Sequence, residues 1–232
     1  MRAKGVLKCI VLFTLMLCMV LPVLSLTSCK YNREYDETEV LEAAERLLRS
    51  AEVLNNIYYG DGIMPMYYGN QNGAYYQADP AHLASLGIET LDDLVFLTER
   101  TFTSTYSQRI YSTILASVSV DGEYVTMARY YQKYVDDDPT GECECIMVYR
   151  DYEQLYTDMM VFDYSTLTVL GSDGDYVNLT VEALVVNDSG EGQTRTIELS
   201  LYEEPNGWRI DTPTYANYSQ YEDYYEESVG GA

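Results

Sequence analysis

The chain is poor in the residues that most catalytic and nucleic-acid-binding sites require. Its 232 residues include one histidine, and 14 Lys+Arg stand against 37 Asp+Glu, giving a formal charge of −23. A single histidine argues against most metal centres and Ser-His-Asp triads. Phosphate contacts need clustered bases, and beyond residue 28 the only lysines are Lys30 and Lys133. The composition therefore excludes a nucleic-acid partner.

The amino terminus has the layout of an export signal. Three bases and no acid precede an apolar run over residues 10–26, which is the order of a basic n-region and an apolar h-region. The run ends in Leu26-Thr27-Ser28-Cys29, which resembles the lipobox of bacterial lipoproteins. That resemblance implies a signal peptide of residues 1–28 and a mature chain that begins at Cys29 with lipid on its sulfur. Removal of residues 1–28 takes the formal charge from −23 to −26.

These features predict a cell-membrane protein, lipid-anchored on the extracytoplasmic face. Residues 29–35 form a short lipidated tether, and the lipid on Cys29 is the only attached group that we expect. An uncleaved membrane anchor is the alternative, because the 17 residues of the apolar run are at the lower limit for spanning a bilayer. Either arrangement places the rest of the chain outside the cytoplasm.

Residues 36–212 predict one α+β domain. An acidic first turn at Asp36 opens a helix, and its apolar residues recur every three or four positions: Leu41, Ala44, Leu48, Ala51, Leu54 and Tyr58. A short helix is expected over residues 80–86, ended by Gly87. Another is expected from Thr90 towards Arg109, with a break within residues 101–105.

The second half of the chain changes to the period-two pattern of strands. We expect a hairpin of residues 114–120 and 123–131 around Asp121-Gly122, because Asp-Gly is a strong hairpin signal. Further strands are expected over residues 143–149, 162–170, 176–186, 194–203 and 208–211. Helices followed by antiparallel strands predict N-terminal helices packed on one face of a curved antiparallel sheet.

The closing motif Gly207-Trp208-Arg209-Ile210, after a long helix and a meander, resembles the cone-shaped nuclear-transport-factor-two-like or cystatin-like superfamily. Residues 75–79, 90–94 and 102–104 are also similar to secreted cystatin-like inhibitors of bacterial cell-wall endopeptidases. The resemblance implies a cystatin-like cone, with a cell-wall hydrolase as one class of partner.

Tyrosine is the unusual component, with 25 residues against four phenylalanines. A tyrosine offers a rigid apolar face with a polar tip, which suits protein interfaces and sugar stacking. The candidate partner-binding residues are Tyr58, Tyr59, Tyr67, Tyr68, Tyr75 and Tyr76. The alternative is that these tyrosines take places that phenylalanine fills in other chains.

The remaining candidates have simple structural interpretations. Cys143 and Cys145 are expected as half-buried side chains, with or without a local disulfide, because two thiolates are too few for zinc. His82 is expected near the start of its helix. The acidic loops do not follow a calcium-binding pattern, so no metal is expected. Residues 213–232 are acidic and tyrosine-rich, and we expect disorder or a weak helix there.

These observations favour a non-catalytic binding or regulatory module whose partner is an exported protein or a basic peptide. A pocket enzyme on the same cone and a carbohydrate-binding module are the alternatives. The enzyme requires an acid–base group in an apolar cavity, and the sugar-binding module requires coplanar exposed tyrosine rings.

The lipid anchor is tested directly by mass spectrometry of the N-terminal peptide from detergent-extracted protein. We expect a peptide that begins at Cys29 and carries the mass of the lipid. An unmodified Cys29, or a peptide that still contains residues 1–28, would contradict the lipoprotein assignment.

Overall fold

The structure, a computed structural model, describes residues 35–120, 123–134, 144–151, 159–186 and 192–215. Within them, helices come first and antiparallel strands follow, which confirms the predicted α+β class. The predicted signal, Cys29, Cys143 and the chain after Tyr215 lie outside the described residues. Among the described residues, no helix is long and apolar enough to cross a membrane.

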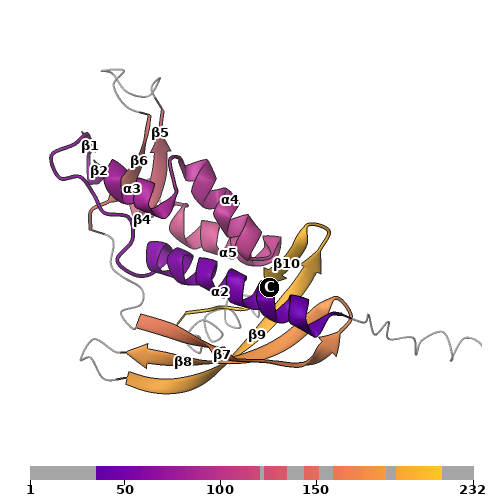
Figure 1. Ribbon diagram of the computed structural model, residues 1–232. Helices are drawn as coiled ribbons and strands as arrows, with labels where there is room; N and C mark the ends of the chain where they lie inside the picture. The colour runs from indigo at the N-terminus through magenta and orange to yellow at the C-terminus, as the bar shows by residue number, and fades with distance from the viewer. Residues whose placement is uncertain (1–34, 121–122, 135–143, 152–158, 187–191, 216–232) are drawn as a thin grey trace, which may run out of the picture.

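The strands form two separate antiparallel sheets of four strands each (Figure 1). The helices are α2 (Glu37–Tyr58), α3 (Pro80–Leu86), α4 (Leu91–Thr101) and α5 (Ser104–Ile114). The large sheet, in the order β10-β9-β8-β7, contains β7 (Met159–Asp173), β8 (Tyr176–Val186), β9 (Gly192–Glu204) and β10 (Gly207–Ile210). The small sheet, in the order β1-β2-β6-β5, contains β1 (Gln71–Asn72), β2 (Tyr75–Gln77), β5 (Tyr130–Lys133) and β6 (Cys145–Tyr149). A separate hairpin joins β3 (Val118–Val120) and β4 (Glu123–Thr126).

Helix α2 lies between the large sheet and helices α4 and α5 (Figure 1). It begins as predicted, because the Asp36 side chain accepts a hydrogen bond from the backbone N–H of Thr38 at 2.9 Å. Its buried residues are Val40, Ala43, Ala44, Leu47, Leu48, Ala51, Leu54, Ile57 and Tyr58. This stripe is wider than the predicted one because the helix packs against two layers. Leu41, which the predicted stripe included, is only half-buried.

A polar contact also joins α2 to the large sheet. One oxygen of the Glu52 carboxylate accepts the Tyr164 hydroxyl at 2.5 Å, and the other accepts the Phe162 backbone N–H at 3.3 Å. Arg49 lies over the Tyr164 ring, with its guanidinium carbon 4.1 Å from the ring centroid. These contacts fix the edge strand β7 against the helix.

The shorter helices follow their sequence signals. Gly87 ends α3 in the left-handed conformation, with φ 70°. Thr90 and Asp93 form a capping box at the start of α4, and the predicted break falls at Phe102-Thr103 between α4 and α5. The two helices therefore have separate axes.

The first predicted hairpin is shorter than expected at both ends. Ile114 is the last residue of α5 and is fully buried, because it continues the helical spacing of Tyr106 and Ile110. Tyr130 starts β5, which pairs with β6 in the small sheet. The alternation that predicted a strand over residues 114–120 overlaps at Ile114 with the four-residue helical repeat of Tyr106 and Ile110. Packing of the helix against the core favours the helical conformation at Ile114.

The predicted meander is confirmed in the large sheet. Along β8 the burial alternates, and the buried residues are Val177, Leu179, Val181, Ala183 and Val185. Leu199 and Leu201 continue this buried face on β9. One face of the sheet therefore packs on α2, and the other is largely polar and exposed.

The carboxyl end of the domain extends beyond the predicted boundary at residue 212. Thr214 and Tyr215 are 1% and 6% exposed. The Asn55 side-chain amide donates to the Thr214 carbonyl at 2.9 Å, and the Tyr215 ring lies 4.6 Å from that of Tyr59. The chain therefore packs on α2 at least as far as Tyr215.

The capping box at α4 predicts a pH-dependent contribution to stability. Backbone N–H groups of Thr90 and Glu89 donate to the Asp93 carboxylate and lower its pKa. A carboxyl group with a lowered pKa stabilises the fold above its unfolded pKa, about 3.9, and this contribution is lost as the pH falls through the folded pKa. We expect Asp93→Asn to lower the free energy of unfolding at pH 7 and to lower it by less at pH 3.

Urea denaturation of the wild type and variant at both pH values measures this difference. Asp92→Asn is the matched control, because the neighbouring Asp92 side chain accepts no hydrogen bond from the described residues; we expect a smaller loss from it at pH 7. An Asp93→Asn loss that stayed constant between pH 7 and pH 3 would contradict the assignment.

Candidate functional site

The carboxyl end of α2 is held by a buried arginine from the chain between β4 and β5. Arg129 is 4% exposed. Its Nη1 donates to the Tyr58 carbonyl at 2.8 Å and its Nη2 to the Gly60 carbonyl at 2.7 Å. The last turn of α2 contains no base of its own, so the guanidinium satisfies carbonyl groups that the helix leaves unpaired and opposes their partial negative charge.

Tyr130, the next residue, fixes the chain as it leaves the helix. Its hydroxyl donates to the Ile57 carbonyl at 2.6 Å and accepts the Ile63 backbone N–H at 3.1 Å. Between these contacts, Gly62 has φ 76°, and a Cβ there would lie 2.2 Å from the Nη2 atom of Arg129. Glycine is required at this position for its conformation and for the space.

This arrangement leads into residues 64–69, which we call the tyrosine loop. The loop is bonded to β2: Met66 N–H donates to the Gln77 carbonyl at 2.7 Å, and Gln77 N–H donates to the Asn70 carbonyl at 2.9 Å. At its start, Met64 N–H donates to Nδ1 of His82 at 2.9 Å. Backbone bonds on both sides give the loop one defined conformation.

The tyrosine loop presents large apolar side chains to solvent. Tyr68 is fully exposed, while Tyr67 and Met64 are 62% and 59% exposed. The Tyr67 ring packs edge-on against the half-buried Tyr76, at 5.4 Å between centroids and 64° between planes. Such side chains on a fixed backbone can bind a partner at a small cost in conformational entropy.

An ion pair lies beside Tyr76. The Arg150 guanidinium carbon lies 6.0 Å from the centre of the Tyr76 ring, and its Nε and Nη2 atoms donate to the Asp151 carboxylate at 2.7 and 2.8 Å. Arg150 lowers the pKa of Asp151 through these hydrogen bonds. The pair adds polar groups beside the exposed aromatic side chains.

The other three candidate tyrosines lie in the core. Tyr58, Tyr59 and Tyr75 are 0%, 4% and 7% exposed. The Tyr58 hydroxyl pairs with Oγ1 of Thr98 at 2.6 Å, and burial raises the Tyr58 pKa. The Tyr75 hydroxyl donates to the Ala128 carbonyl at 2.7 Å. Their rings are not presented to a partner, so the binding hypothesis applies to Tyr67, Tyr68 and Tyr76.

The remaining candidates do not gather at this site. Cys145 is buried, is disulfide-bonded and has its Sγ 3.8 Å from Sδ of Met147. The other four cysteines of the chain lie outside the described residues, so the predicted pairing with Cys143 stays a prediction. Across the described ranges, no group of three or more His, Cys, Asp or Glu side chains could hold a metal ion.

Sequence reasoning missed the residues that position the loop. Arg129 and Tyr130 fall within the strand predicted over residues 123–131, and arginine is seldom fully buried unless it is paired. The unpaired carbonyl end of α2, which has no base in its last turn, was the available signal that a cation from elsewhere would be needed.

The comparisons with known proteins identify no relative. No family model matches the chain. No curated protein and no solved structure matches it either. The site is therefore interpreted from its own geometry.

Removal of the Arg129 side chain tests its role at the end of α2. Arg129→Met keeps apolar bulk but leaves the Tyr58 and Gly60 carbonyls without their donors, and we expect a loss of about 2–4 kcal/mol in the free energy of unfolding. Urea denaturation measures the loss. Arg195→Met, at an exposed residue of β9, is the control and should change stability by less than about 0.5 kcal/mol; equal effects of the two substitutions would contradict the role.

Proposed function

We propose that this protein is a lipid-anchored, extracytoplasmic binding or regulatory module without catalytic activity, whose partner is an exported protein or peptide with basic groups. Its fold would be a cystatin-like cone, in which the helices pack on a curved sheet. The observation that carries this proposal is the tyrosine loop, where Met64, Tyr67 and Tyr68 are exposed on a backbone held from both sides. A cell-wall hydrolase is one partner that the resemblance to endopeptidase inhibitors suggests.

The chemistry of the loop suits protein recognition. Tyrosines are enriched among the few residues that supply most of the binding energy at protein interfaces. Met64 of the same loop is exposed as well, and flexible methionines adapt to varied partner surfaces. The loop would therefore supply the apolar centre of an interface.

The charge of the chain supports a basic partner. The formal charge is −23, and a net charge of this size produces a long-range potential that attracts cationic proteins and repels acidic ones. Asp61 and Asp79 flank the tyrosine loop in the chain. Electrostatic attraction would speed association and make it sensitive to salt.

No observation favours either alternative. A pocket enzyme would need a buried carboxyl group beside aromatic side chains, whereas the buried polar residues within the described part of the chain are Thr98, Thr101, Thr103, Ser107, Arg129, Lys133, Arg209 and Thr214. A sugar platform would need coplanar rings, whereas Tyr67 and Tyr76 are inclined at 64°. The exposed tyrosine loop therefore supports a binding module over these two alternatives.

The test compares full-length wild-type protein with Tyr68→Ala, each purified from native membranes at low and high salt. We expect the wild type to retain a basic exported protein that is depleted at high salt. With that protein purified, Tyr68→Ala should raise the dissociation constant at least about tenfold, since truncation of a hot-spot residue at an interface costs about 2 kcal/mol or more and about 1.4 kcal/mol is tenfold.

Tyr134→Ala is the matched control, because Tyr134 is 52% exposed but follows β5, at the opposite edge of the small sheet from β1. It should bind like the wild type. The same dissociation constant for wild type and Tyr68→Ala would contradict the role of the loop. Failure to retain any exported protein at either salt concentration would contradict the proposed function.

A further inference from the structure

A second feature lies away from the tyrosine loop, where α4 ends beside the turn between β9 and β10. A pocket of about 520 Å³ opens there. Its lining includes Phe96, Arg100, Ser104, Glu204, Asn206 and Arg209. The pocket thus combines an aromatic wall with two arginines in a strongly acidic chain.

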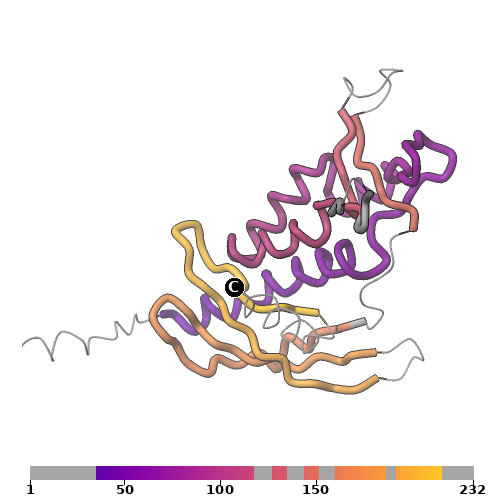
Figure 2. Tube along the Cα trace, turned by 180° about the vertical axis from the view of Figure 1, so that it is seen from behind, coloured from indigo at the N-terminus to yellow at the C-terminus, as the bar shows by residue number. Residues whose placement is uncertain are grey.

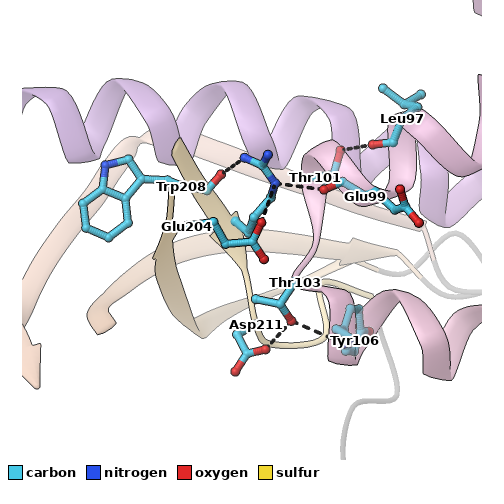
Figure 3. Close-up of polar contacts among 9 residues, drawn as sticks. Leu97, Glu99, Thr101, Thr103, Tyr106, Glu204, Trp208 and Asp211 are labelled. Carbon is cyan, nitrogen blue, oxygen red and sulfur yellow. Dashed lines mark hydrogen bonds and ion pairs between the residues drawn. The ribbon is translucent and has the colours of Figure 1, made fainter. Parts of the chain in front are cut away.

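Arg209, one of the lining residues, is held by several polar contacts. The residue is only 9% exposed. Its Nε donates to the Glu99 carbonyl at 2.8 Å and lies 3.7 Å from the Glu204 carboxylate, and its Nη1 donates to the Trp208 carbonyl at 2.8 Å (Figure 3). These contacts fix the plane of the guanidinium.

One nitrogen of this guanidinium remains available. Nη2 of Arg209 has no hydrogen-bond partner among the described residues, and it is not among their fully buried unsatisfied atoms. Arg209 lines the pocket, and Nη2 carries two N–H donors that no described residue accepts. A fixed, nearly buried guanidinium is a strong donor to a carboxylate, since little entropy is lost on binding.

Arg100 supplies a second positive charge near an apolar surface. Its guanidinium carbon lies 5.4 Å from the centre of the Phe96 ring, and Phe96 is 60% exposed. Arg100 forms no ion pair with a described residue, although acids outnumber bases by 37 to 14 in the chain. An exposed phenylalanine beside an unpaired arginine suits a ligand with an apolar group next to a negative charge.

We propose that this pocket binds a monocarboxylate that carries an apolar group on the adjacent carbon. The carboxylate would lie between Nη2 of Arg209 and the Arg100 guanidinium, and the apolar group would pack on the Phe96 ring. A single negative charge fits better than a phosphate dianion, because Glu99 and Glu204 also border the pocket and the chain as a whole is acidic. The carboxyl terminus of a peptide and a free organic acid share this chemistry.

Isothermal titration calorimetry on the full-length protein in detergent tests the proposal with three probes. N-acetyl-phenylalanine represents a peptide terminus, phenylacetate represents a free acid, and N-acetyl-phenylalanine amide lacks the charge. We expect N-acetyl-phenylalanine or phenylacetate to bind at least tenfold more tightly than the amide, and the tighter of the two identifies the source of the carboxylate. Equal binding of all three probes, or no binding of any, would overturn the proposal.

Variants place the binding in this pocket. Arg100→Gln and Phe96→Ala should each weaken binding of the acid at least fivefold, and Arg100→Gln should reduce its salt dependence. Arg46→Gln, on the exposed side of α2, is the matched control and should bind like the wild type. If neither pocket variant changes the affinity, the acid binds elsewhere, and the assignment to this pocket is overturned. The proposal does not depend on the tyrosine loop, so Tyr68→Ala should leave this binding intact.

Discussion

The rest of the structure depends on the hydrogen bonds made to the backbone carbonyl groups at the carboxyl end of α2. This helix lies between the large sheet and the other helices, yet its last turn contains no base. Arg129 and Tyr130 fill the gap with three hydrogen bonds to the carbonyls of Ile57, Tyr58 and Gly60. Because Tyr130 begins β5, the same contacts join the small sheet to the central helix. Both views of the chain show the small sheet at this end of α2 (Figure 2).

Arg209 donates a hydrogen bond to a backbone carbonyl near the end of α4, as Arg129 does at the end of α2. Its Nε binds the carbonyl of Glu99 near the carboxyl end of α4. Close by, Thr103 N–H donates to the Ile210 carbonyl at 3.0 Å, and the Thr103 hydroxyl bonds to the Asp211 carboxylate. Each sheet is therefore joined to a helix end by one nearly buried arginine. The cost of burying these cations is offset by hydrogen bonds to carbonyl groups that would otherwise be unpaired.

Sequence patterns predicted most elements where a local signal was strong. Asp36, Gly87 and the Thr90–Asp93 box marked helix ends, and strict alternation marked β8. The division into two sheets could not be predicted, because the pairing of Tyr75 with Tyr149 joins residues far apart in the chain. Nor could the division of the tyrosines, because a doublet such as Tyr58-Tyr59 looks the same whether its backbone is a buried helix end or an exposed loop. Long-range packing decided both.

The position of the one tryptophan gives the molecule an internal optical reporter. Trp208 is 8% exposed, and its carbonyl accepts a hydrogen bond from Nη1 of Arg209. Its emission therefore reports the environment of β10, the strand that joins the large sheet to α4, without contributions from the small sheet. Loosening of this joint would expose the indole to water and shift its emission to longer wavelength. Separation of the sheet from the helices can thus be followed in the unlabelled protein.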